Sequence, residues 1–350
     1  MGFYEPAEHV QRLEDAGRKI VRLNVGNTNL PPPARAIARA REIMGGSNPG
    51  YGPVKGLPRL RRRIAEREGC GIENVVVGPG SKLLLYGLLD VLCDRGETVA
   101  TPSPYYPAYA LAAGRLGLKF RPIPTRLENG WSVTLSDIPK VNLLILCNPL
   151  NPTGTVYDEN VIRDVLELGL RSGFRVILDE AYKGLSFREI PRYESAIRLR
   201  SFSKEFGLES WRLGYAVTPK DVADKLGSFL QATITCVPSF IQEAGLACLE
   251  NETEIRAANA AIWRSRSETA RQALAAQGFR FVPPDSGMYF FVTRPDIRDA
   301  DIFCRELLDR TGVAVAPGGS FGGFGRFVRI CANQPEDILR NALALLKRGT

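Results

Sequence analysis

The chain has 350 residues, of which 44% are hydrophobic and 24% charged, a composition that excludes disordered and fibrous proteins and allows two folded domains. It carries 46 Lys and Arg against 38 Asp and Glu, a formal net charge of +8, but only one histidine, His9. A single histidine nearly excludes catalytic triads and histidine-rich zinc sites, so the chemistry must use Lys, Arg, Tyr, Asp, Cys or a cofactor.

The cysteines and the apolar segments indicate a cytoplasmic protein. Seven cysteines are scattered along the chain, which argues against both a disulfide framework and a CxxC metal site. The N-terminal residues lack the apolar stretch of a signal peptide. The longest apolar run, residues 83–92, is much shorter than the roughly 20 residues of a membrane span. We expect no metal and no membrane partner.

The most basic segment is residues 59–67 (RLRRRIAER). Leu57, Leu60 and Ile64 fall on one helical face with arginines around the rest, which predicts an exposed amphipathic helix. The positive charge would also suit nucleic acid, but no zinc finger, winged helix or aromatic-interleaved RNA-binding surface accompanies it. We therefore expect no nucleic-acid partner.

From about residue 70 to residue 220, short apolar runs alternate with helical patterns. The apolar segments are residues 74–77, 83–92, 98–100, 143–147, 161–170 and 175–178. This alternation predicts an α/β fold with a mostly parallel sheet covered by helices.

Beyond about residue 240 the pattern changes. A long polar helix is predicted at residues 252–277, strands at 287–293 and 326–331, and a last helix at 336–347. These elements predict a second, smaller α+β domain.

Ligands of a parallel sheet collect at the carboxyl ends of its strands, so the residues there are the candidates for a site. Residues 78–81 (GPGS) precede an apolar helix whose free N–H groups could bind phosphate, or they form an ordinary loop and N-cap. Residues 148–154 (NPLNPTG) follow another strand and also fit a turn.

Two further segments carry ionisable groups. Residues 179–182 (DEAY) bring Asp179 to the ligand edge, where a carboxylate needs a partner or water. Residues 200–204 (RSFSK) end on Lys204, and Arg212 follows eight residues later. Taken singly, a solvated loop explains the lysine and arginine of the last segment.

Together and in this order, the four segments resemble those of the fold-type I enzymes that use pyridoxal 5′-phosphate, specifically the class I and II aminotransferases. The resemblance extends from about residue 23 to residue 334. It implies a large cofactor-binding domain over residues 26–240 and a small α+β domain over residues 241–350. Residues 1–25 would join the small domain.

The resemblance also implies roles for residues around the cofactor ring. Lys204 would form the Schiff base with pyridoxal phosphate and transfer the proton at the substrate Cα. Asp179 would keep the pyridine nitrogen protonated, and Tyr182 and Asn151 would hydrogen-bond the phenolic oxygen. Tyr106, in the sequence PYYP, would stack on the ring.

The remaining implied roles concern the phosphate and the substrate. The phosphate would be bound by Gly80, Ser81, Ser201, Ser203 and Arg212. Tyr51, in residues 48–52 (NPGYG), would reach the phosphate of a neighbouring subunit, which implies a homodimer with shared active sites. Arg329 would pair with the substrate α-carboxylate, beside Asn151 and the backbone of Gly26.

Arg326 is the nearest alternative to Arg329, but strand alternation puts it on the opposite face. The glycine-rich residues 317–323 are interpreted as structural, because they lack a preceding strand and a following helix.

The chain departs from the family pattern at Ser210, where glycine is common, and at residues 27–29 after Gly26. Residues 231–240 contain no second arginine for a side-chain carboxylate, so a dicarboxylic amino acid is doubtful. Histidinol phosphate, threonine phosphate, and aromatic or cationic side chains remain open.

Transamination between an amino acid and a 2-oxo acid is the function we expect. The same cofactor also supports decarboxylation, β-elimination, cyclisation and oxidation of amino acids. Outside this chemistry, Ser201 and Lys204 match the SxxK pattern of penicillin-binding serine hydrolases, although their SDN and KTG partners are missing. A non-catalytic nucleic-acid binder acting through residues 59–63 is a further alternative.

Overall fold

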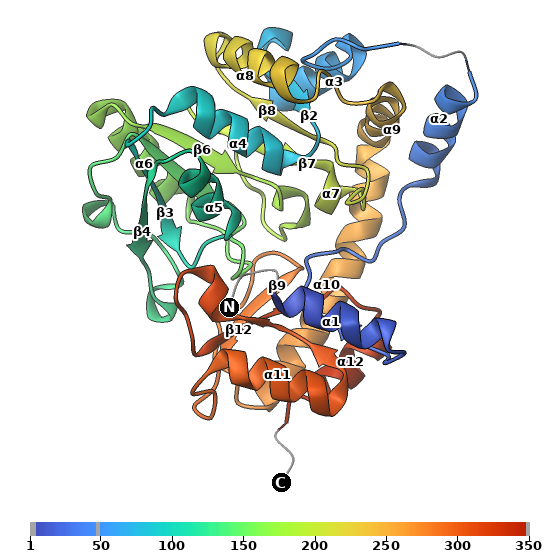
Figure 1. The fold of residues 1–350 in the computed structure, drawn as a ribbon, viewed down its shortest axis with the longest axis vertical. Coiled ribbons are helices and arrows are strands. Elements are labelled where there is room, and N and C mark those ends of the chain that lie inside the picture. The colour runs from blue at the N-terminus through green and yellow to red at the C-terminus, as the bar shows by residue number, and fades with distance from the viewer. Residues whose placement is uncertain (1–4, 47–49, 348–350) are drawn as a thin grey trace.

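A computed structural model describes residues 5–46 and 50–347 (Figure 1). Its main sheet has seven strands in the order β2-β8-β7-β6-β5-β3-β4. They are β2 (Val75–Gly78), β3 (Thr98–Ser103), β4 (Lys119–Pro124), β5 (Leu143–Cys147), β6 (Arg175–Asp179), β7 (Ile197–Ser201) and β8 (Gly214–Val217). All neighbouring strands are parallel except β8, which runs antiparallel to β2 and β7. The predicted mostly parallel α/β sheet is confirmed.

Helices cover both faces of this sheet, as a parallel sheet requires. They include α4 (Ser81–Leu92), α5 (Ala108–Arg115), α6 (Glu159–Ser172), α7 (Phe202–Glu205) and α8 (Lys220–Thr233). Strand β5 shows how the faces are filled. Ile145 belongs to the same apolar cluster as Leu88 of α4, whereas Leu144 and Leu146 cluster with Ile162 of α6. Side chains alternate along a strand, so neighbouring residues meet helices on opposite faces.

The smaller unit contains a three-stranded antiparallel sheet in the order β11-β12-β9. Its strands are β9 (Tyr289–Thr293), β11 (Ala316–Pro317) and β12 (Phe327–Cys331), and β1 (Val21–Arg22) pairs in parallel with β10 (Val313–Ala314). Its helices are α10 (Glu252–Ala276), α11 (Ala300–Thr311), α12 (Glu336–Ala344) and α1 (Glu5–Asp15). Val10 of α1 packs with Leu308 of α11, which ties the N-terminal segment to this unit.

Three more helices lie at the side of the main sheet where β2 is the last strand (Figure 1). They are α2 (Ala34–Met44), α3 (Pro58–Glu68) and α9 (Ser239–Glu250), and α9 packs against both of the others. Within the described residues, no helix is long and apolar enough to cross a membrane.

The basic run at residues 59–67 forms the predicted amphipathic helix, α3, but the expectation that its arginines are solvated is wrong for three of them. Arg61 donates to the carbonyls of Val75 and Ile72, and Arg63 donates to that of Leu249. Arg67 forms ion pairs with two glutamates. These arginines bond to neighbouring elements because α3 lies between β2 and α9.

Candidate active site

The carboxyl ends of β5, β6 and β7 meet at one edge of the main sheet and bring distant polar residues into one cavity. This first cavity, of about 510 Å³, contains eight of the residues predicted from sequence. They are Ser81, Tyr106, Asp179, Tyr182, Ser201, Ser203, Lys204 and Arg212. The adjacency follows from the topology, because β5, β6 and β7 are consecutive parallel neighbours.

Asp179 ends β6 and supplies a buried carboxylate to this cavity, with an exposed fraction of 5%. The backbone N–H of Ala181 donates to Oδ1 at 3.1 Å, and the hydroxyl of Tyr109 donates to Oδ2 at 2.7 Å. Burial raises the pKa of Asp179, and these two hydrogen bonds act in the opposite direction. The carboxylate is thus suited to pair with a protonated nitrogen placed in the cavity.

The opposite part of the cavity can bind an anion. Ser81 begins α4, and Gly80 before it has a φ of +82°. A Cβ atom on Gly80 would collide with the guanidinium of Arg212, so glycine lets the arginine approach the helix N-terminus. Free N–H groups of a helix start, serine hydroxyls and a guanidinium together form a binding site suited to phosphate.

Lys204 lies in α7 and lines both this cavity and a second one of about 290 Å³. Its Nζ donates to the carbonyl of Gly26 at 2.5 Å. Burial lowers the pKa of Lys204, partly opposed by the negative charge of Glu209. An amine with a lowered pKa is uncharged in a larger fraction of molecules near neutral pH, and only the uncharged amine can act as a nucleophile or accept a proton.

The second cavity contains Arg329, which is only 3% exposed. Its Nη1 donates to Oδ1 of Asn151 at 3.0 Å and its Nη2 to the carbonyl of Asn24 at 2.6 Å. The guanidinium carbon lies 4.6 Å from the ring centre of Tyr289 and 4.8 Å from that of Phe321. These contacts hold a planar donor group in place for a carboxylate.

A hydrogen-bonded chain connects Arg329 with the first cavity. Nδ2 of Asn151 donates to the hydroxyl of Tyr182 at 3.1 Å, and that hydroxyl lies 3.0 Å from the hydroxyl of Tyr289. Burial raises the pKa of Tyr182, so this residue remains a proton donor. The two cavities therefore share one polar wall.

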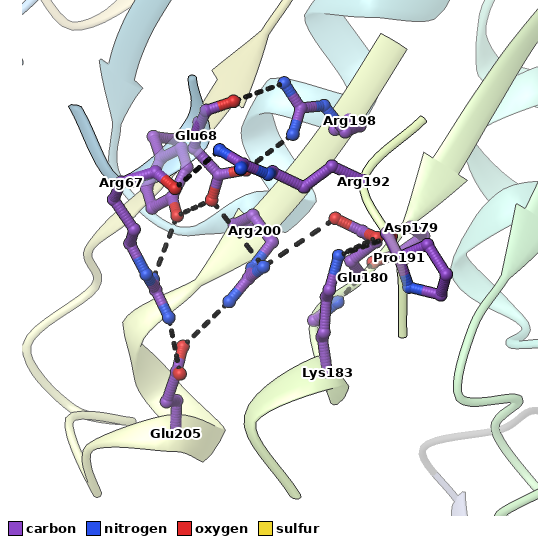
Figure 2. Close-up of polar contacts among 12 residues, drawn as sticks. Arg67, Glu68, Asp179, Glu180, Lys183, Pro191, Arg192, Arg198, Arg200 and Glu205 are labelled. Carbon is purple, nitrogen blue, oxygen red and sulfur yellow. Dashed lines mark hydrogen bonds and ion pairs between the residues drawn. The ribbon is translucent and has the colours of Figure 1, made fainter. Parts of the chain in front are cut away.

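A buried ion network lies behind the same strand ends (Figure 2). Arg200, at the end of β7, approaches Glu68 of α3, Glu180 after β6 and Glu205 of α7, at 3.6, 3.7 and 3.1 Å. Burial alone raises the pKa of Glu205, but Arg67 and Arg200 outweigh it and hold that pKa at about 2. All three glutamates form ion pairs with Arg200.

Most of the sequence-predicted residues come together. Gly26, Asn151 and Arg329 line the second cavity, and Gly80 approaches Arg212 beside the first. Tyr51 lines neither cavity and is 90% exposed. Asn48 and Pro49 of its motif lie outside the described residues.

Several residues of the site were missed by the sequence analysis. Lys82, Tyr109, Cys147 and Glu209 line the first cavity, and Asn24, Tyr289 and Ser320 line the second. Tyr109 is part of the segment PYYPAY, whose tyrosine spacing was the only available signal. Ser320 belongs to the glycine-rich residues interpreted as structural, so this loop also forms part of a cavity wall.

The chain is similar to known aminotransferases in both sequence and fold. Residues 18–346 match the family described as "Aminotransferase class I and II". The chain is 35% identical to an aspartate aminotransferase of Thermococcus kodakarensis, over 88% of this chain and 83% of that protein. It is 30% identical to the arginine–pyruvate transaminase AruH of Pseudomonas aeruginosa, over 88% and 84%. The structure of Thermus thermophilus aspartate aminotransferase with maleate superimposes with a TM-score of 0.93 at 27% identity, covering 99% of this chain and 97% of the other.

Proposed function

This chain belongs to the class I and II aminotransferases, which use pyridoxal phosphate to move an amino group between an amino acid and a 2-oxo acid, and we propose that Lys204 is the residue that carries this reaction. The supporting observation is that Lys204 lines both cavities at once. One cavity suits a phosphate and a basic ring, and the other suits a carboxylate.

The residues of the first cavity fit the cofactor. A phosphate needs the donors of Ser81, Ser201 and Arg212, and a pyridine nitrogen needs the buried carboxylate of Asp179. Gly80 lacks the Cβ that would displace Arg212. Tyr106 lines both cavities and offers an aromatic face between these groups. We assign Gly80 and Ser203 to the phosphate as well.

Bound pyridoxal phosphate supplies an electron sink for the bond that breaks at the substrate Cα. Asp179 holds a proton on the ring nitrogen, and Tyr182 and Asn151 provide hydrogen-bonding groups near its phenolic oxygen. The amine of Lys204, uncharged at lower pH than a solvated lysine, takes and returns the Cα proton. Arg329 orients the α-carboxylate so that Cα faces this amine.

The reaction type is tested by a half reaction. Holoenzyme mixed with single amino acids, without a 2-oxo acid, is expected to yield the matching 2-oxo acid and pyridoxamine phosphate, detected by mass spectrometry. A panel of acidic, cationic, aromatic and phosphorylated substrates would also identify the preferred side chain. Products limited to CO₂, ammonia or peroxide would instead indicate the other reactions of this cofactor.

Arg329→Lys is expected to lower kcat/KM for the amino acid by about 10- to 100-fold, mainly through KM, because lysine cannot form the paired hydrogen bonds of a guanidinium. Steady-state kinetics measure the change. Arg326→Lys is the matched control, since Arg326 is exposed, precedes β12 and lines neither site cavity. Equal effects of the two substitutions would argue against the assignment of Arg329.

We further propose a homodimer in which Tyr51 reaches the phosphate site of the partner. The exposure of Tyr51, and of Met44 seven residues earlier in the chain at 66%, supports such an interface. Tyr51→Phe is expected to weaken cofactor binding about tenfold without dissociating the dimer, since one charge-assisted hydrogen bond is lost. Analytical ultracentrifugation and cofactor titration test this, and a monomeric wild-type protein would refute it.

The domains and the location are proposed on similar grounds. We propose a large cofactor-binding unit and a small unit that residues 1–25 join. The sequence predicted that the large unit ends at residue 240. Because α9 packs against α2 and α3, we propose that α9 belongs to the large unit and that the boundary between the two units lies within α10. We propose a cytoplasmic location, which the seven unpaired cysteines support.

A further inference from the structure

Tyr289, the first residue of β9, places its hydroxyl at the wall that the two cavities share. Its side chain lines the second cavity, is only 2% exposed, and has its hydroxyl 3.0 Å from that of Tyr182. We propose that Tyr289 is a positioning residue for amino transfer, whose hydroxyl donates to Tyr182 and so directs the proton of Tyr182 toward the phenolic oxygen of the cofactor. This inference rests on the proposed function.

The number of protons and lone pairs on the Tyr182 hydroxyl determines that Tyr289 is the donor in the hydrogen bond between the two tyrosines. A tyrosine hydroxyl has one proton to donate and two lone pairs. The orientation of the Asn151 amide is set by Arg329, which donates to Oδ1, so Nδ2 faces Tyr182 as a donor. If the proton of Tyr182 points to the cofactor, the bond between the two tyrosines must be donated by Tyr289.

A hydroxyl that accepts two hydrogen bonds is itself a stronger hydrogen-bond donor. Tyr182 with both donors stabilises the ionised phenolic oxygen more than Tyr182 with Asn151 alone. The more strongly Tyr182 donates to this oxygen, the less the oxygen would hold the proton of the linkage between Lys204 and the cofactor, so the linkage would lose that proton at lower pH. The Tyr289 hydroxyl is therefore expected to keep this linkage reactive at lower pH.

The other ionisable groups facing the two tyrosines come from five elements or strand ends. They are Tyr106 before α5, Cys147 at the end of β5, Asp179 at the end of β6, Lys204 in α7, and Arg329 and Cys331 in β12. Replacing Tyr289 by Phe leaves all of them in place. It also keeps the aromatic ring 4.6 Å from the Arg329 guanidinium, so only the hydroxyl is removed.

Gly26 provides independent support, because its missing side chain leaves the space that the Tyr289 hydroxyl fills. A Cβ atom on Gly26 would collide with that oxygen, whereas the nearest ring carbons would lie 3.2 and 3.6 Å away. The φ of Gly26 is not positive, so the requirement for glycine is steric. The hydroxyl therefore explains why alanine does not fit at position 26.

The first experiment titrates the visible absorption of holoenzyme with pH. The absorption changes as the linkage between Lys204 and the cofactor loses its proton, and the pH at which half of this change has occurred is the midpoint. Tyr289→Phe is expected to raise this midpoint by about 0.4 to 1 pH unit, the effect of one hydrogen bond. Tyr215→Phe is the matched control, because its buried hydroxyl is hydrogen-bonded to Glu68 and Arg67 but lines neither cavity. This control is expected to leave the midpoint unchanged.

The outcomes separate this inference from the proposed function. An unchanged midpoint in Tyr289→Phe, with normal amino transfer by the wild type, would overturn only the role of Tyr289. A wild-type protein that neither binds pyridoxal phosphate nor transfers amino groups would overturn the proposed function as well.

The second experiment uses the protein without cofactor and measures thermal unfolding of a double-mutant cycle. Gly26→Ala is expected to lower Tm less in the Tyr289→Phe background than in the wild-type background. Phenylalanine lacks the hydroxyl oxygen with which the alanine Cβ would collide most closely. Equal reductions in both backgrounds would overturn the steric relation between Gly26 and the hydroxyl.

Discussion

Replacing Lys204 by alanine is expected to reduce the rate of the half reaction by more than about a thousandfold, because the proposed function makes this one side chain both the covalent anchor and the proton carrier. The fold should persist, since the Lys204 side chain makes one hydrogen bond within residues 5–46 and 50–347, to the Gly26 carbonyl. Single-turnover mixing of the variant with an amino acid, followed by product analysis, measures the loss.

A chemical test accompanies the kinetic one. Borohydride treatment of wild-type holoenzyme should attach the cofactor irreversibly to the peptide containing Lys204, as read by mass spectrometry. Lys220→Ala is a suitable control, because Lys220 is exposed and pairs with Asp224 on the surface of α8. A Lys204→Ala variant that retained a tenth of the wild-type rate would exclude the assigned role.

Arg200→Leu is expected to destabilise the protein by about 3–5 kcal/mol, because it leaves buried carboxylates without their shared partner. One guanidinium approaches Glu68, Glu180 and Glu205, which come from three different elements (Figure 2). Urea unfolding of the cofactor-free protein measures the change in the free energy of unfolding, provided the transition is two-state.

The matched comparison is Arg171→Leu on the outer face of α6. Arg171 forms an exposed ion pair with Glu167 one helical turn earlier, at 3.5 Å. Such pairs contribute about 0–1 kcal/mol, so this substitution should have little effect. If Arg200→Leu lowered the free energy of unfolding as little as Arg171→Leu, the buried network would contribute no more to stability than an exposed ion pair.

The position of this network connects stability with the site. Glu180 directly follows Asp179, Glu205 directly follows Lys204, and Arg200 directly precedes Ser201. Pairing among these charged residues holds the three segments in a fixed relation behind the cavity. The network therefore positions Asp179, Ser201 and Lys204, to which the proposed function gives roles toward the cofactor, although Glu180, Arg200 and Glu205 do not themselves line the cavity.

The sequence by itself was enough to predict a mostly parallel sheet and the approximate positions of four of its seven strands, β2, β3, β5 and β6; β4, β7 and β8 were not among the predicted segments. Runs such as residues 143–147, where predicted and observed strands coincide, are recognisable because a buried parallel strand is apolar on both faces. Asp179 was singled out because it directly follows such a run, whereas Lys204 and Arg212 were assigned through the family resemblance of the four segments together. The antiparallel direction of β8 was not predicted, since strand direction depends on the connections between elements.

What the tertiary structure alone decided is which distant residues touch. Tyr109 and Asp179 are 70 residues apart, Tyr182 and Tyr289 are 107 apart, and Arg67 and Glu205 are 138 apart. Local patterns report helix and strand periodicity, because neighbours in the chain share one backbone geometry. Contacts across the fold depend on how several elements pack together. For this reason Arg61, Arg63 and Arg67 of α3 were expected in solvent and were found bonded to neighbouring elements. Tyr289 was predicted as part of a strand but not as part of the site.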